Sequence, residues 1–407
     1  MSTRAAPLAG LRILALEQMQ ALPYATQLLA RLGAEVVKVE HPERGDLGRG
    51  SQPQAPDAAG VPAGATYLRN NSAKRSIGVD LASETGQDLI RRLAPKFDVV
   101  AENFKPGALA RYGLDYASLA AVHPPLVYGS ISGFGHTTDS PYGHWPAFAP
   151  IAEAMSGMYI FKRPTDQPVT VSPVGALGDT GSGLFAAVGL LAALRHRDAT
   201  GEGSHVDIAM ADCMVAFADV VPNYWSMGLD PRAVPPLINH GFALADGEIV
   251  MQIGRPYQFA RLAEVLGHPE WVDDDRFADP RGWVDHLDVI GDALATWAAD
   301  RRPVEVADAL ARAGIAAAPV FDAADLAVDP HVAARSMLTP VADDVAGRGP
   351  VLTAGNPVRL TGPDGVAAGD DPTRPPGLGA DTAAVLAEDL DLSPAQIAAL
   401  RDAGTIA

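Results

Sequence analysis

The stretch RILALEQMQALPYATQLLARLGAEVVKVE, residues 12–40, decides the fold class. Two short apolar runs within it, RILAL (Arg12–Leu16) and EVVKVE (Glu35–Glu40), are typical of buried parallel strands. Between them we expect a helix from Pro23 to Leu32, because proline favours a helix start and Gly33 favours a helix end. The stretch therefore predicts a strand–helix–strand unit.

The same alternation continues along the chain. A helix is expected at 86–94, strands at 97–104, 126–132 and 204–210, and the strongest helix signal covers Asp179–Arg195. This pattern predicts an α/β fold, a Rossmann-like doubly wound parallel sheet with helices on both faces. No Gly-x-Gly-x-x-Gly motif follows the first strand, so a dinucleotide site has no support.

A second domain is predicted where the sequence changes character near Tyr224. Prolines and glycines cluster there, and a strand at 248–253 and two helices follow, which favours a smaller α+β domain over 225–329. After this domain the chain becomes rich in loops and ends in two acidic helices. A chain of 407 residues is long enough for two domains.

Composition excludes several classes of function. The formal net charge of −18 disfavours nucleic acid and anionic membranes as partners, because both carry negative charge. The single Cys213 forms no intramolecular disulfide, and no His, Cys, Asp or Glu grouping has metal-ligand spacing. We see no signal peptide, and the longest apolar stretch, Gly183–Leu194, is too short to span a bilayer. We therefore expect a cytoplasmic protein without a metal.

Asp179 is the candidate for chemistry, in the sequence GALGDTGSGLFAAVG. It precedes an apolar helix, with Gly178 before it and Gly181 and Gly183 after it. One interpretation is structural, since aspartate is a favoured N-cap residue. In the other, a carboxylate held ionised by the helix dipole attacks a thioester, and exposed backbone N–H groups stabilise the oxyanion. The local sequence leaves both interpretations open.

The chain resembles the family III CoA-transferases, which include the formyl-CoA:oxalate and carnitine CoA-transferases; the 2-methylacyl-CoA racemases share their fold. The resemblance runs from Leu8 to the C-terminus through segments in the family's order: LAGLRILAL, QLLARLGAEVVKVEHPERGD, NNSAKRSIGVDL, DVVAENFKPGALARYGLDY, SISGFG, GALGDTGSGLFAAVGLLAAL, TGEGSHVDIAM, DPHVAARSM and LSPAQIAALRDAGTI. It implies a large Rossmann-like domain built from 1–224 and 330–407, with the small domain between. It also implies an interlocked homodimer, in which each ring-shaped chain is threaded through the other.

The resemblance also assigns the chemistry. Asp179 matches the family's nucleophile, which implies an aspartyl–acyl anhydride followed by an aspartyl-CoA thioester. Gly178, Gly181 and Gly183 are then expected to support the turn and the oxyanion. The implied partners are an acyl-CoA and a small carboxylic acid, with coenzyme A as a substrate and no tightly bound cofactor.

Further positions match the family's ligand contacts less specifically. Gln20 and Ala21 match the loop that lines the acyl pocket, and an ordinary strand-to-helix turn is the alternative. The positions matching CoA contacts are His41, Lys74, Arg75, Asn103, Phe104 and Arg111. For Lys74 and Arg75 the alternative is a solvated charge pair.

Two other functions stay open. Where the racemases carry a His–Asp pair this chain has Phe148 and Ala149, and racemisation needs an acid/base residue on each face of an enolate. Transferase is therefore favoured over racemase, and Glu153, the only carboxylate of that segment, is expected on the surface. A non-catalytic acyl-CoA binding protein would not need Asp179. Arg255 is a weaker candidate to hold a second carboxylate, which would indicate a dicarboxylic acid.

Overall fold

The computed structural model describes residues 6–161, 163, 166–171, 175–232, 236–361 and 373–407. The chain divides into two compact units, Met1–Arg232 with Ala334–Ala407, and Ala233–Ala333. The sequence-based domain limits, 1–224, 225–329 and 330–407, stay a prediction. Each unit is described below by itself.

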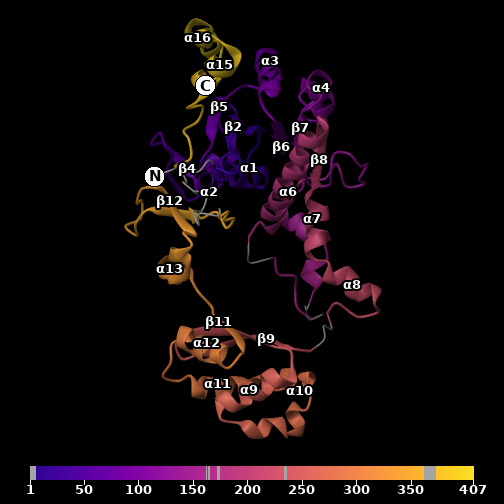
Figure 1. Ribbon diagram of the computed structural model, residues 1–407, viewed down its shortest axis with the longest axis vertical. Coiled ribbons are helices and arrows are strands. Elements are labelled where there is room, and N and C mark those ends of the chain that lie inside the picture. The colour runs from indigo at the N-terminus through magenta and orange to yellow at the C-terminus, as the bar shows by residue number, and fades with distance from the viewer. Residues whose placement is uncertain (1–5, 162, 164–165, 172–174, 233–235, 362–372) are drawn as a thin grey trace. The chain divides into compact units, whose positions relative to one another are not determined.

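A six-stranded parallel sheet forms the centre of the larger unit and confirms the predicted α/β fold (Figure 1). Its strand order is β5-β2-β1-β6-β7-β8, so the order reverses between β1 and β6. In parallel sheets the crevice outside such a reversal is where ligands bind. The strands are β1 (Arg12–Leu16), β2 (Glu35–Glu40), β5 (Arg75–Gly78), β6 (Val99–Glu102), β7 (Val127–Ser132) and β8 (Ser204–Ala209).

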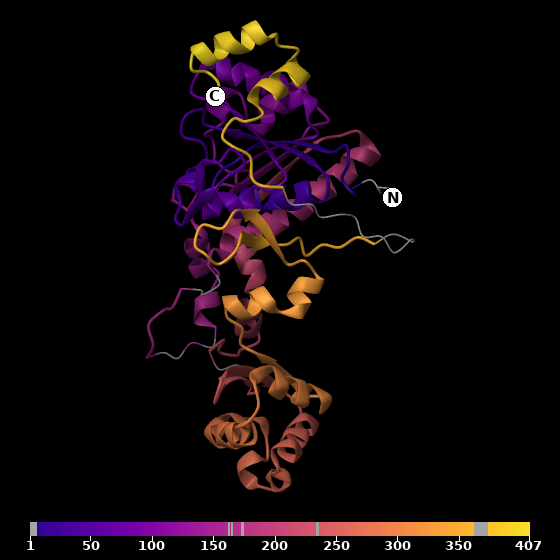
Figure 2. The same ribbon diagram turned by 90° about the vertical axis from the view of Figure 1, so that its left-hand side faces the viewer.

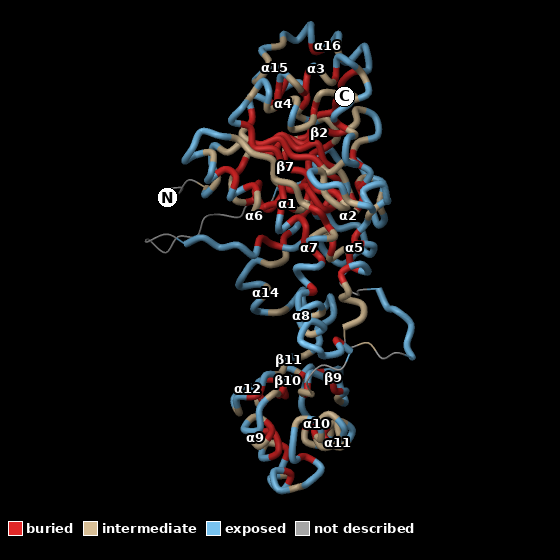
Figure 3. The backbone as a smooth tube through the Cα atoms, turned by 90° about the vertical axis from the view of Figure 1, so that its right-hand side faces the viewer, coloured by how far each residue is buried: buried red, intermediate tan, exposed pale blue. Residues whose placement is uncertain are grey.

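Helices cover both faces of this sheet, which explains why a central strand such as β1 carries buried apolar side chains on both faces. In β1, Ile13 and Ala15 face one apolar cluster, and Leu14 and Leu16 face the other. Figure 3 shows the strands as the most deeply buried part of the unit. The first face carries α1 (Ala21–Arg31), α5 (Ala149–Met155), α6 (Leu177–Thr200) and α7 (Met210–Phe217); the second carries α3 (Glu84–Leu93), α4 (Tyr116–Val122), α15 (Thr382–Leu390) and α16 (Pro394–Asp402).

The C-terminal segment returns to the larger unit and packs beside α3 (Figure 2). The carboxylate of Asp381 accepts the backbone N–H of Ser76 in β5 at 2.9 Å. Asp389 in α15 pairs with Arg12 of β1 at 2.9 Å. These bonds join residues 305 and 377 positions apart and close the second face of the sheet.

Helix α6 is the longest element, with 24 residues, and extends beyond the predicted Asp179–Arg195 at both ends. By length and composition alone it is apolar enough to cross a membrane, contrary to the expectation from the sequence. Half of that stretch is buried inside the protein, where α6 packs against α1, β7 and β8. A core helix of a soluble α/β protein passes the same test, so this is weak evidence for a membrane span.

Smaller elements surround the sheet of the larger unit. Two hairpins and α2 enclose a separate apolar cluster around Tyr67. The elements are β3 (Gln54–Pro56), β4 (Pro62–Gly64), α2 (Ala65–Asn70), α8 (Val220–Ser226), β12 (Leu338–Ala342), β13 (Val351–Ala354) and the 3₁₀ turns η1 (Leu47–Gly50), η2 (Ala94–Lys96), η3 (Ala110–Tyr112) and η4 (Met158–Ile160).

The smaller unit contains a three-stranded antiparallel sheet of order β11-β10-β9 with helices around it. Aromatic rings fill its core, and Phe259 stacks on Trp283 with ring centroids 4.8 Å apart. Its elements are β9 (Ile238–Leu244), β10 (Gly247–Ile253), α9 (Pro256–Leu266), η5 (Pro269–Val272), η6 (Asp275–Phe277), α10 (Pro280–Asp285), α11 (Leu287–Trp297), α12 (Pro303–Arg312), β11 (Ala316–Pro319) and α13 (Ala323–Val328), with α14 (Pro330–Ala334) at its end.

Candidate active site

Asp179 lies in the first turn of α6 and does not cap it. The helix begins at Leu177, and the N-cap position is taken by Ala176, whose backbone has a positive φ of 51°. The capping interpretation is therefore wrong. Asp179 remains within the first turn, where the positive end of the helix dipole favours a negative charge.

The surroundings of Asp179 raise its pKa to about 6. Burial is the largest cause, and the negative charge of Glu153 adds to it, whereas the positive charge of Arg69 acts in the opposite direction. A carboxylate with this pKa is mostly ionised at neutral pH yet more basic than an exposed aspartate. Both properties suit a nucleophile.

Glu153 is buried, which corrects the expectation that it lies on the surface. Its side chain is 1% exposed, and one carboxylate oxygen accepts the backbone N–H of Gly178 at 3.0 Å. The hydroxyl of Tyr159 donates to the other oxygen. Glu153 therefore ties α5 to the residue directly before Asp179.

The three glycines near Asp179 lie inside α6, not in an open turn. A Cβ atom at Gly178 would stand 2.8 Å from Ala149 Cα, and one at Gly183 would stand 2.7 Å from the carbonyl oxygen of Ala21. A Cβ at Gly181 would meet the ring of Phe217 at 2.5 Å. Close packing explains these glycines. The expected oxyanion role of Gly178 is contradicted, because its N–H is already bonded to Glu153.

A cavity of about 520 Å³ lies beside the start of α6. Gln20, from the loop after β1, lines it together with Arg69 of α2 and with Ala176 and Thr180. The guanidinium of Arg69 donates a hydrogen bond to Gln20 Oε1. The structure thus brings Gln20 to the turn that carries Asp179, whereas Ala21 is buried as the first residue of α1.

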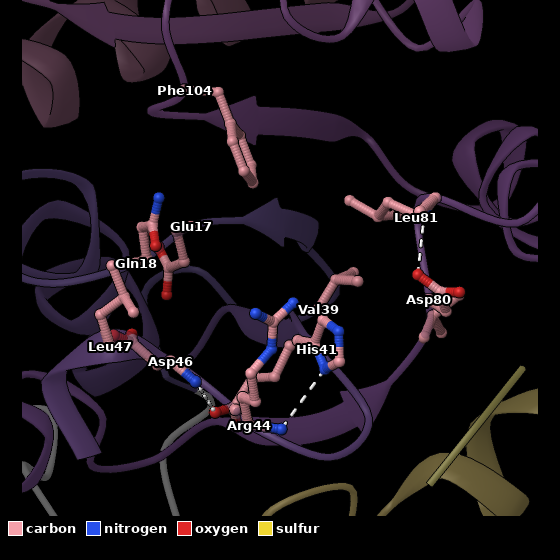
Figure 4. A pocket seen from close by; sticks show the side chains of 14 residues that line it. Glu17, Gln18, Val39, His41, Arg44, Asp46, Leu47, Asp80, Leu81 and Phe104 are labelled. Atoms are coloured by element: carbon pink, nitrogen blue, oxygen red, sulfur yellow. Dashed lines mark hydrogen bonds between the residues drawn. The ribbon is translucent and has the colours of Figure 1, made fainter. Parts of the chain in front are cut away.

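A second cavity, of about 320 Å³, lies outside the carboxyl ends of β1, β2, β5 and β6. Figure 4 shows the Phe104 ring pointing into it across from His41 and Arg44. His41 Nδ1 accepts the backbone N–H groups of Glu43 and Arg44 at 3.2 and 3.3 Å. A ring nitrogen that accepts carries no proton, so the neutral imidazole has its N–H on Nε2.

Comparison with known proteins identifies the family to which this chain belongs. The model of CoA-transferase family III matches residues 8–382. The chain belongs to CoA-transferase family III. It is 35% identical to the succinate–glutarate CoA-transferase of Agrobacterium fabrum, covering 95% of this chain and 97% of the relative. It is 32% identical to the acetyl-CoA:oxalate CoA-transferase of Acetobacter aceti, covering 91% and 92%.

A solved structure supports the same assignment. The CaiB/BaiF family protein from Brucella suis matches with a TM-score of 0.81 and 34% identity, over 95% of this chain and 100% of that one. The protein is therefore an enzyme, a family III CoA-transferase, and coenzyme A is its substrate.

The other positions expected to contact CoA have protein partners in this CoA-transferase. Asn103, just after β6, forms two hydrogen bonds with the backbone of Gln18, at 3.0 and 2.9 Å. Lys74 is fully buried, and its ammonium donates to Glu17 at 2.6 Å and to Asn71 at 3.0 Å. Burial lowers the pKa of Lys74 to about 8. Its expected contact with CoA phosphates has no support here.

Arg75 and Arg111 do not line either cavity of this CoA-transferase. Arg75 pairs with Glu35 at 3.0 Å and with Glu388 at 2.8 Å. Arg111 is exposed, with its guanidinium 4.6 Å from the ring centroid of Tyr112. Their roles as CoA contacts stay predictions.

The positions that separate transferase from racemase lie at the start of α5. Phe148 is the N-cap residue and is 69% exposed, and Ala149 is buried. Neither side chain can transfer a proton. Arg255 precedes α9 and lines a cavity of the smaller unit. Within the described ranges, no group of three or more His, Cys, Asp and Glu side chains is arranged to hold a metal ion.

Proposed function

We propose that this enzyme moves CoA from an acyl-CoA to a small carboxylic acid, with Asp179 as its covalent nucleophile. The observation that carries the proposal is the position of Asp179: a buried carboxylate with a pKa of about 6 in the first turn of α6, next to a cavity. The names of two relatives add support, since one acts on succinate and glutarate and the other on oxalate.

The proposed reaction begins when the Asp179 carboxylate attacks the acyl-CoA carbonyl. The carbon–sulfur bond breaks, CoA leaves as a thiolate, and an aspartyl–acyl anhydride forms. The thiolate then attacks the aspartyl carbonyl, which releases the acyl group as a carboxylate and leaves an aspartyl-CoA thioester. The acceptor carboxylate attacks the carbonyl of this thioester, which releases the CoA thiolate and forms an anhydride between Asp179 and the acceptor. The thiolate then attacks the acceptor carbonyl of this anhydride, which gives the new acyl-CoA and restores the Asp179 carboxylate.

The nucleotide end of CoA is assigned to the cavity of about 320 Å³. Two features of this cavity support the assignment. The Phe104 ring offers an aromatic face to the adenine, and the His41 Nε2–H and the Arg44 guanidinium are available to donate hydrogen bonds to phosphate. The site of a parallel sheet where the strand order reverses is also the expected place for such a ligand.

The test is to trap the covalent intermediate. The purified protein is incubated with a panel of acyl-CoAs, quenched with hydroxylamine, and mapped by mass spectrometry. Hydroxylamine converts an activated aspartate into a hydroxamate, so the expected mark lies on Asp179 and disappears in Asp179→Asn. A wild-type enzyme that turns over with no mark on Asp179 would refute the covalent route.

The interlocked homodimer is also part of the proposal. It is supported by exposed apolar side chains on α6 and α7, a face that soluble monomers rarely leave open to water. This apolar face consists of Leu184, Phe185, Val188, Leu191, Val215 and Phe217.

A further inference from the structure

The cavity beside Asp179 has a charge opposite to that of the whole protein. Two arginines, Arg31 and Arg69, line it, and none of the described lining residues is an aspartate or a glutamate. The chain as a whole carries a net charge of −18. A positive cavity in an acidic protein favours an anionic ligand at that place.

Arg69 has donor groups to offer such a ligand. Its guanidinium donates to the side-chain oxygen of Gln20, and among the described residues it forms no ion pair with a carboxylate. Arg12, Arg49 and Arg75 differ, since each is paired with at least two acidic side chains. A guanidinium has five N–H donors in a planar fork that matches a carboxylate, and an amide oxygen such as that of Gln20 leaves most of them available.

The position of Arg69 relates it to the reacting carboxylate. The N-cap residue Ala176 and Thr180, the residue directly after Asp179, line the same cavity as Arg69, whereas Asp179 itself is not one of its lining residues. The Asp179 carboxylate also experiences the positive charge of Arg69. An acyl group bonded to Asp179 is therefore attached one residue away from the wall of this cavity.

We propose that Arg69 determines specificity by pairing with the second carboxylate of a dicarboxylic substrate, whose first carboxyl group carries CoA. The inference rests on the proposed function, because it takes Asp179 as the place where the acyl group is attached. Gln20 holds the guanidinium in position, and the rest of the fork binds the substrate carboxylate. Arg69, not Arg255, is thus the residue we assign to a second carboxylate.

The experiment compares two acceptor acids of equal chain length, succinate and butyrate, with one common acyl-CoA donor. In the wild type, succinate is expected to have the higher kcat/KM. In Arg69→Gln, kcat/KM for succinate is expected to fall about ten- to hundredfold, the usual loss when a charged hydrogen-bonding partner is removed. The value for butyrate should fall much less, because butyrate has no second carboxylate and loses only the effect of the Arg69 charge on the pKa of Asp179.

The matched control is Arg92→Gln, which removes an exposed arginine from α3 that lines neither cavity. It is expected to keep the preference of the wild type. If kcat/KM falls equally for succinate and for butyrate in Arg69→Gln, the proposal is overturned and Arg69 acts at the reacting centre instead. A wild-type preference for butyrate would overturn it as well.

A binding measurement separates this inference from the proposed reaction. Calorimetric titration of succinate into the protein needs no turnover, so it reports on Arg69 even if trapping at Asp179 fails. Weaker succinate binding in Arg69→Gln than in the wild type supports the pairing. Equal affinity in both proteins, or no succinate binding to the wild type, overturns it.

Discussion

At the scale of single residues, the basicity of Asp179 depends on two neighbours of opposite charge. Burial and Glu153 raise its pKa, and Arg69 acts against them. With a pKa of about 6, roughly nine in ten Asp179 side chains are ionised at pH 7. The balance keeps the carboxylate charged under physiological conditions while making it a stronger base than an exposed aspartate.

Replacing Glu153 by glutamine should shift the pH dependence of the reaction. The amide oxygen can still accept the Gly178 N–H, but the negative charge is gone. The pKa of Asp179 therefore falls, and because the carboxylate is the reactive form, the acid limb of kcat/KM should move to lower pH by up to about one unit. The measurement is the pH profile of Glu153→Gln against the wild type.

A variant without the hydrogen bond provides the control. Glu153→Ala leaves the Gly178 N–H buried without its acceptor, so its rate should fall across the whole pH range. An acid limb that stays in place, or moves to higher pH, in Glu153→Gln would show that the Glu153 charge does not act on Asp179.

At the scale of elements, the approach of α1 to α6 depends on Gly183. A Cβ there would stand 2.7 Å from the carbonyl oxygen of Ala21, a backbone atom that cannot rotate away. Gly183→Ala should lower the free energy of unfolding by about 1–2 kcal/mol, because the overlap outweighs the better helix propensity of alanine. Urea unfolding measures the change.

Gly291 in α11 is the matched control for this substitution. It is also a helical glycine, but its Cβ would lie at an ordinary 3.4 Å from the Phe242 ring. Gly291→Ala should therefore keep or raise the free energy of unfolding, by up to about 1 kcal/mol. If both variants behave alike, the contact between α1 and α6 does not require glycine.

The sequence predicts elements well where hydrophobic pattern alone determines them. β1 and β2 begin and end at the expected residues, since both are apolar runs bounded by turns. The predicted start of α6 at Asp179 is wrong, because the prediction relied on the preference of aspartate for the N-cap position. The observed N-cap residue is Ala176, in a left-handed conformation that residue propensities do not indicate.

The parts of the site that the sequence could not predict depend on contacts between distant positions. In the sequence Lys74 is indistinguishable from a solvent-exposed lysine. In the folded chain it is buried and pairs with Glu17, which lies 57 positions away. Arg69 carries no motif, and its position relative to Gln20 and α6 follows only from the folded chain. Residue type shows which chemistry is possible, and tertiary packing decides which groups take part.

At the scale of the whole molecule, the apolar face of α6 and α7 predicts self-association. Val188, near its middle, is 67% exposed. The wild type should have a solution mass twice the 42.4 kDa of one chain, since a dimer would remove this face from water.

Val188→Asp should be produced as a monomer instead of a dimer, because burying an unpaired carboxylate in an apolar interface is costly. Val122→Asp, at the end of α4, is the control: Val122 is equally exposed, at 70%, but lies outside this face, so its variant should stay dimeric. Light scattering coupled to size-exclusion chromatography measures both masses. A wild-type monomer, or a Val188→Asp protein as dimeric as Val122→Asp, would exclude this face as the interface.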